Sequence, residues 1–107
     1  MQAFDVLGDP VRRRILEALV DTEHASGEIV EIVRADYDIS QSAVSQHLKV
    51  LRDSGFAAVT SDGTRRLYSI DTTGLRQVDE WLDGFRQLWA PRLEALATEI
   101  ARGKKTP

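Results

Sequence analysis

The sequence predicts a mainly α-helical fold with one small β-hairpin, in a single domain that spans all 107 residues. Three observations support this prediction. Apolar residues recur at steps of three and four in several segments before residue 55, as in amphipathic helices. The pattern then changes period, and residues 56–70 predict two short strands around Asp62-Gly63, a tight hairpin signal. A long apolar stripe at helical spacing follows between residues 72 and about 102.

The first two helices have clear start signals. A short helix near the N-terminus presents Phe4 and Leu7. Asp9 is a good N-cap and Pro10 suits the first helical position, so a second helix begins there and runs to about Val20. Its arginines lie on the side opposite its apolar residues, so we expect the helix to pack with those arginines outward.

Two further helices follow in close succession. One begins at Ser26 and ends by about Tyr37, and the next is capped by Ser40 and stops at Gly55, a residue that favours the left-handed C-terminal position. Two helices joined by a short connection form a helix-turn-helix. We therefore expect residues 40–54 to be a recognition helix.

The outer face of this recognition helix is unusual for so charged a chain. Val44, Leu48 and Leu51 share the buried face, because they are four and three residues apart. The opposite face is formed by Ser42, Ser45, Gln46 and Lys49. Such short polar side chains can meet base edges and phosphates in a major groove that admits one helix, whereas glutamates would repel phosphate. The face therefore predicts contact with double-stranded DNA.

The hairpin carries cations beside its turn. Thr64, Arg65 and Arg66 follow Asp62-Gly63, so the hairpin can act as a wing that reaches the adjacent backbone or minor groove. Arg65 and Arg66 point to opposite faces of a strand, and the sequence does not choose between them. Helix, helix-turn-helix, wing and flanking helix together predict a winged helix-turn-helix domain.

Charge is segregated along the chain. The formal net charge of -3 would by itself argue against nucleic-acid binding. Residues 40–66, however, carry four basic and two acidic side chains, whereas residues 71–100 carry three basic and six acidic ones. Three consecutive arginines follow Val11. We expect one of them, with Arg13 as the candidate, to contact phosphate, and another to pair with an acid such as Glu17.

The apolar stripe of the C-terminal segment is longer than one small domain can cover. Because a large side chain is stabilised by about 1.5–3 kcal/mol on burial, we expect a homodimer formed by the terminal helices. The expected interface residues are Phe4, Leu7, Leu75, Val78, Trp81, Leu82, Phe85, Trp89 and Leu93. A small-molecule pocket would use the same aromatic residues, and packing is the favoured interpretation. Pro91 predicts a kink or a helix restart near Ala90.

Three motifs in order resemble the ArsR/SmtB family of bacterial winged-helix repressors. They are "LGDPVRRRILEAL" (7–19), "SQSAVSQHLKVLRDSGF" (40–56) and "DGTRRLYSI" (62–70). The resemblance covers about residues 3–90. It implies a homodimer on a partly palindromic operator, with the terminal helices at the dimer contact. It also implies repression that is relieved by a signal, often repression of the gene's own operon.

The metal-sensing motifs of that family are missing. Metal-sensing members carry cysteines near the start of the helix that corresponds to residues 26–34, and this chain has no cysteine. The other common site uses Asp and His on the last helix, which has acids here but no His. We therefore expect no metal and no cofactor. A metal- or ligand-gated sensor that uses those acids with His24 or His47 remains an alternative, although an isolated His is weak support.

The sequence thus predicts a sequence-specific DNA-binding transcriptional regulator, a dimeric repressor. The expected DNA contacts are Arg13, Ser40, Gln41, Ser42, Ser45, Gln46, His47, Lys49, Thr64, Arg65 and Arg66. A winged helix that binds another protein is the alternative without DNA. We expect no enzyme, because the chain has neither a Gly-rich phosphate loop nor a Cys nucleophile. We also expect a cytoplasmic location and no membrane contact, because the chain shows neither a signal peptide nor a spanning stretch.

Overall fold

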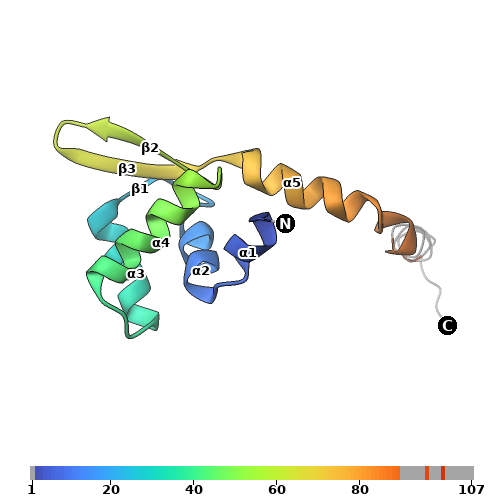
Figure 1. The fold of residues 1–107 in the computed structure, drawn as a ribbon, viewed down its shortest axis with the longest axis horizontal. Helices are drawn as coiled ribbons and strands as arrows, with labels where there is room; N and C mark the ends of the chain where they lie inside the picture. The colour runs from blue at the N-terminus through green and yellow to red at the C-terminus, as the bar shows by residue number, and fades with distance from the viewer. Residues whose placement is uncertain (1, 90–95, 97–99, 101–107) are drawn as a thin grey trace. The chain divides into compact units, whose positions relative to one another are not determined.

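The computed structural model describes residues 2–89, 96 and 100, and it confirms a mainly helical fold with a small sheet (Figure 1). The elements are α1 (Gln2–Leu7), α2 (Pro10–Ala18), β1 (His24–Ala25), α3 (Ser26–Asp36), α4 (Gln41–Asp53), β2 (Ala57–Asp62), β3 (Arg65–Ile70) and α5 (Thr72–Asp83). The chain divides into two compact units, Met1–Gln77 and Val78–Pro107. None of the helices in the described residues is long and apolar enough to cross a bilayer.

Helix α2 begins as the sequence predicts. The Asp9 carboxylate accepts hydrogen bonds from the backbone N–H groups of Val11 at 2.8 Å and Arg12 at 3.2 Å, and Pro10 is the first helical residue. Burial acts to raise the pKa of Asp9, but the two N–H donors and nearby positive charge outweigh it and lower the pKa. The ionised carboxylate therefore holds the first turn of α2.

Helices α3 and α4 form the predicted helix-turn-helix, with residues 37–40 as the connection. They pack with α2 around a core of apolar side chains. The core residues of these three helices that have no solvent exposure are Ile15, Ile29, Val33, Val44 and Leu51. This packing fixes which side of α4 faces outward.

The end of α4 directs the chain into the sheet. Gly55 has a φ of 81°, the left-handed conformation that glycine adopts without strain. The N–H of Phe56 donates to the Leu51 carbonyl at 2.8 Å, and the N–H of Gly55 donates to the Arg52 carbonyl at 3.3 Å. These two bonds make a Schellman motif. Because Phe56 is fully buried, the motif fixes the path from α4 into β2.

The sheet has one strand more than the sequence predicts. Its antiparallel strands lie in the order β1-β3-β2. Strand β1 pairs His24 with Tyr68 and Ala25 with Leu67. A strand of two residues is too short to show an alternating pattern, so only the packing of α3 beside the sheet reveals it.

The β2–β3 hairpin is the predicted wing, and it extends beyond the helices of its unit (Figure 1). Its turn lies one residue later than expected. Asp62 pairs with Arg65, which leaves Gly63 and Thr64 as the two loop residues. Gly63 has a φ of 64°, and such a positive φ is what a two-residue hairpin turn requires.

Helix α5 starts at Thr72, where the sequence predicts the start of the C-terminal segment. Asp71 accepts from the backbone N–H of Thr73 at 2.9 Å and from its hydroxyl at 2.8 Å. These two bonds lower the pKa of Asp71. The N–H of Gly74 donates to the Gly55 carbonyl at 2.8 Å, so the first turn of α5 is tied to the end of α4.

The second unit has a helix break that the apolar spacing of the sequence does not predict. After Asp83 the chain forms a turn at residues 84–85, and residues 86–89 are helical again. The N–H groups of Gly84 and Phe85 donate to carbonyls only three residues earlier, the tighter spacing of a 3₁₀ turn. The predicted kink near Ala90 and the interface residue Leu93 lie outside the described residues.

Candidate nucleic-acid interface

Helix α4 has one buried and one exposed face, as predicted. Val44, Leu48 and Leu51 have exposed fractions of 0 %, 2 % and 0 %. The outward side chains form what we call the α4 ridge, which comprises Ser42, Ser45, Gln46 and Lys49, all exposed. No acidic side chain belongs to this ridge, so it offers donors and acceptors without repelling phosphate.

The N-terminal end of α4 is capped by its own hydroxyls. Ser40 Oγ accepts from the Ala43 N–H at 3.1 Å and lies 3.1 Å from Ser42 Oγ. Gln41 is exposed on the same first turn. Helix N-termini attract anions because their N–H groups and their dipole point outward, so this end of α4 suits a phosphate contact.

The cation of the α4 ridge is held in a surface ion pair. Lys49 Nζ lies 2.8 Å from Asp53 Oδ2, and this hydrogen bond is the main reason that the pKa of Asp53 is lowered. Arg52 Nε lies farther away, at 3.9 Å from Asp53 Oδ1. Exposed pairs of this kind contribute little to stability, because water screens the two charges. Lys49 can therefore exchange Asp53 for a DNA phosphate at small cost.

His47 lies on the flank of α4 and is half-buried. Its Nδ1 is 3.2 Å from Arg12 Nη1, and it must accept because a guanidinium only donates. Arg12 also donates to the carbonyls of Val6 at 2.7 Å and Asp5 at 3.0 Å. Arg12 therefore connects the last turn of α1 to α4 through His47. This contact helps to fix the position of α4, whose neighbouring face carries the predicted DNA contacts.

The other two arginines of α2 also have partners. Arg13 Nη1 donates to the Leu7 carbonyl at 2.6 Å while the side chain stays exposed, and its remaining donors are available to phosphate. Arg14 Nε lies 2.9 Å from Asp36 Oδ2. One of these arginines therefore pairs with an acid, as predicted, but the acid is Asp36 and not Glu17. Helix spacing indicates partners on the same helix, whereas α2 packs against α3 and brings Asp36 closer.

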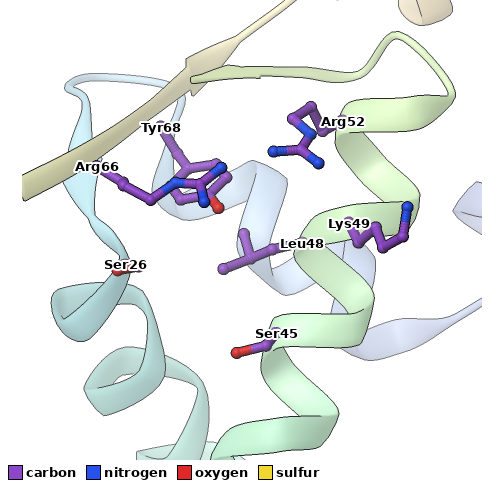
Figure 2. Close-up of a pocket in the computed structure, with 7 residues that line it drawn as sticks. All are labelled: Ser26, Ser45, Leu48, Lys49, Arg52, Arg66 and Tyr68. Atoms are coloured by element: carbon purple, nitrogen blue, oxygen red, sulfur yellow. The ribbon is translucent and has the colours of Figure 1, made fainter. Parts of the chain in front are cut away.

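The wing presents its cations on two faces. Thr64, Arg65 and Arg66 are all exposed. Arg66 points toward α4 on the same face of β3 as Tyr68, two residues on (Figure 2). Arg65 lies on the opposite face. Glu28 has a lowered pKa, mainly through the Ala25 N–H and His24, and the charge of Arg65 adds to this effect.

A cleft of about 250 Å³ lies between α4, β3 and the start of α3 (Figure 2). Its lining residues are Ser26, Ser45, Leu48, Lys49, Arg52, Arg66 and Tyr68. Ser45, Lys49 and Arg66 are predicted DNA contacts, whereas the sequence pattern does not link them to Arg52, Tyr68 or Ser26. The spacing of these residues could have revealed the link. Lys49 and Arg52 are three residues apart on a helix, and Arg66 and Tyr68 are two residues apart on a strand, so each pair shares one face.

The histidines have local partners. His24 Nδ1 lies 3.4 Å from Glu28 Oε1, and His47 contacts Arg12. In the part of the chain that the structure describes, no three His, Asp or Glu side chains gather in a way that would hold a metal ion. The metal-gated alternative therefore gains no support from these side chains.

Comparison with known proteins identifies the family. Residues 7–60, from the end of α1 to β2, match a family described as a helix-turn-helix domain. The solved structure of an ArsR family transcriptional regulator, RHA00566, superposes with a TM-score of 0.70 over 83% of this chain and 88% of that chain, at 26% identity. The chain belongs to the ArsR/SmtB family of winged-helix regulators.

Curated relatives of this ArsR/SmtB regulator act in transcription. It is 40% identical to the HTH-type transcriptional regulator Rv2034 of Mycobacterium tuberculosis, over 92% of this chain and 86% of the relative. It is 30% identical to the transcriptional repressor SdpR of Bacillus subtilis, over 77% of this chain and 87% of that protein. The ArsR/SmtB chain is therefore a DNA-binding transcriptional regulator.

Proposed function

We propose that this regulator is a homodimeric, cytoplasmic repressor that binds a partly palindromic operator. The observation that carries the proposal is the α4 ridge: an exposed helical face of short polar side chains and one cation, held outward by a fully packed opposite face. The major groove is about 12 Å wide and accepts a single helix. In it, Ser42, Ser45, Gln46 and Lys49 read bases or hold phosphates.

The wing supports this proposal. Thr64, Arg65 and Arg66 are exposed near the hairpin turn, where cations and a hydroxyl suit the DNA backbone or the minor groove. Contacts of this kind fix the orientation of a protein on the duplex, whereas base contacts give it specificity. The wing and the first turn of α4 therefore position the ridge over its base pairs.

The dimer proposal depends on the exposed apolar side chains of the C-terminal segment. Trp81 is 49% exposed, Phe85 39% and Trp89 37%, and the rings of Trp81 and Phe85 lie 4.5 Å apart. Large contiguous apolar patches usually mark interaction sites. We propose that a second copy covers this stripe. Sedimentation equilibrium should show a dimer at micromolar concentration and a monomer for Phe85→Glu; a monomeric parent would reject the dimer.

Selection of bound sequences from random duplex DNA tests the operator proposal. A recovered inverted repeat would give the half-site spacing and support the two-fold dimer. On that operator, Gln46→Ala with Lys49→Ala should lose about 1–3 kcal/mol for each base contact removed. Lys49→Ala alone should reduce the slope of log K against log salt by about 0.9 for one phosphate contact.

A matched control variant distinguishes the loss of a contact at Lys49 from the loss of any single positive charge. Arg34→Ala removes one positive charge from the exposed last turn of α3, which is not part of the α4 ridge, and should leave operator affinity nearly unchanged. Equal losses from Arg34→Ala and Lys49→Ala would reject the ridge as the reading surface. If no duplex is bound in a salt-dependent way, the domain would instead be a protein-interaction module.

A further inference from the structure

We propose that the cleft between α4 and β3 is a phosphate site, occupied by one phosphodiester group of the operator strand that passes between the recognition helix and the wing. The inference rests on the proposed function. It adds to the α4 ridge a second contact surface, with Tyr68, Arg66 and Arg52 as its donors (Figure 2).

Tyr68 is the first observation in favour of a ligand. Its side chain is almost entirely covered, with 7% of its surface exposed, and its hydroxyl is directed into the cleft (Figure 2). Among the described residues, this hydroxyl has no hydrogen-bond partner. None of the buried side-chain polar atoms among the described residues lacks a partner, so the unpaired Tyr68 hydroxyl is one that solvent reaches. It can therefore donate to an acceptor that enters the cleft.

The second observation in favour of an anion is the position of Arg66 and Arg52. Arg66 extends from β3 and Arg52 from α4 toward the space above Tyr68 (Figure 2). Within the described residues Arg66 has no ion pair, and the contact from Arg52 to Asp53 is long, at 3.9 Å. Guanidinium groups match phosphate oxygens in pairs and hold them more strongly than neutral donors do.

The rest of the lining selects for an anion. Ser26 and Ser45 add hydroxyl donors, Lys49 adds a cation, and Leu48 adds an aliphatic surface. Among the residues that the structure describes, no carboxylate lines the cleft, so these side chains offer a cationic ligand no partner. Its volume of about 250 Å³ is below the roughly 300–1,000 Å³ of sites for drug-sized molecules. One phosphate group fits better than a whole organic effector.

The arrangement of the two DNA-contacting elements identifies the source of the phosphate. A helix in the major groove and a wing at the adjacent minor groove lie on either side of one sugar–phosphate strand, because that strand separates the two grooves. The cleft lies between those two elements of the protein (Figure 2). A phosphodiester of that strand is therefore the anion that DNA binding brings to Tyr68.

The test uses variants that remove one donor each. Tyr68→Phe deletes only the hydroxyl and keeps the packed ring, and Arg66→Gln acts at an exposed position. Each should weaken operator binding about tenfold, which corresponds to about 1.4 kcal/mol, with an unchanged melting temperature. Tyr37→Phe is the matched control, because Tyr37 is the only other tyrosine and lies outside the cleft, in the connection before α4; it should bind like the parent.

Operators with a single neutral methylphosphonate identify the phosphate. We expect one position per half-site at which neutralisation weakens the parent about tenfold and weakens Tyr68→Phe less, because only the arginines still hold the phosphate in that variant. Titration of the free protein with inorganic phosphate at constant ionic strength tests the other source. Saturable binding that is lost in Tyr68→Phe, without coupling to any operator phosphate, would overturn the assignment to DNA.

The two proposals fail in different ways. If Tyr68→Phe and Arg66→Gln bind the operator like the parent while Gln46→Ala with Lys49→Ala abolishes binding, the phosphate site is wrong and the DNA-binding proposal stands. If the parent shows no salt-dependent duplex binding, the proposed function itself is wrong. A loss in Tyr68→Phe that is the same at every methylphosphonate position would also reject the site, because it indicates an indirect effect.

Discussion

Gly74→Ala should destabilise this protein, although the same change usually stabilises a helix. Gly74 is buried in the first turns of α5. A Cβ atom there would lie 2.5 Å from Phe56 Cε1, 2.6 Å from Cδ1 and 2.7 Å from Cζ. Three ring carbons would have to move, and Phe56 has no solvent-exposed surface to move into. The obstacle is therefore packing.

The magnitude follows from two opposing effects. Alanine gains about 1 kcal/mol over glycine from helix propensity, whereas forcing extra volume into a packed core costs about 1–3 kcal/mol. The upper part of that range applies here, because the contacts fall below 3 Å and Phe56 is fully enclosed. We expect a net loss of about 1–2 kcal/mol, or about 5–10 °C in melting temperature for a domain of this size.

Thermal unfolding followed by circular dichroism measures this effect, with Gly27→Ala as the control. Gly27 lies in the first turn of α3, and a Cβ atom there would have no neighbour within 4 Å. It should stabilise the fold by about 0.4–1 kcal/mol. Opposite signs for the two substitutions are the expected result. A melting temperature for Gly74→Ala at or above that of the parent would refute the packing argument.

Two further predictions concern single carboxylates. The lowered pKa of Asp9 means that its ionised form stabilises the folded state, and this contribution is lost as the pH falls below about 4. The variant Asp9→Asn keeps a capping oxygen but has no carboxylate to protonate. In urea titrations it should therefore lose less stability than the parent between pH 5 and pH 3. Asp53→Asn should tighten operator binding about twofold to fivefold in fluorescence anisotropy, because it frees Lys49 and removes an anion near DNA. Its melting temperature should change little. Unchanged or weaker binding would contradict the exchange of Asp53 for phosphate.

The sequence predicted much of the candidate site because the relevant signals are local. The cap at Ser40, the terminator at Gly55 and the two faces of α4 depend on residues at most seven positions apart. Those interactions are set by helix geometry, so the pattern shows them before any packing is known. The assignment of α4 as a recognition helix with an acid-free outer face came from the sequence alone.

The tertiary structure decided how distant segments meet. Arg14 pairs with Asp36 on another helix, and Arg12 meets His47 across α2 and α4. The wing turn lies one residue later than its Asp-Gly signal, because strand pairing sets the register.

The cleft between α4 and β3 is the clearest example of a candidate site that depends on tertiary packing. In the sequence, Tyr68 is one residue of a predicted strand with no sign of a ligand role. Its hydroxyl lies beside Arg52 and Arg66 only because β3 packs against the helix-turn-helix. Sequence spacing determines which residues share one face of one element, whereas contacts between elements depend on how their side chains pack. The sequence therefore specified the surface that we propose faces DNA, and packing between α4 and β3 specified the cleft beside it.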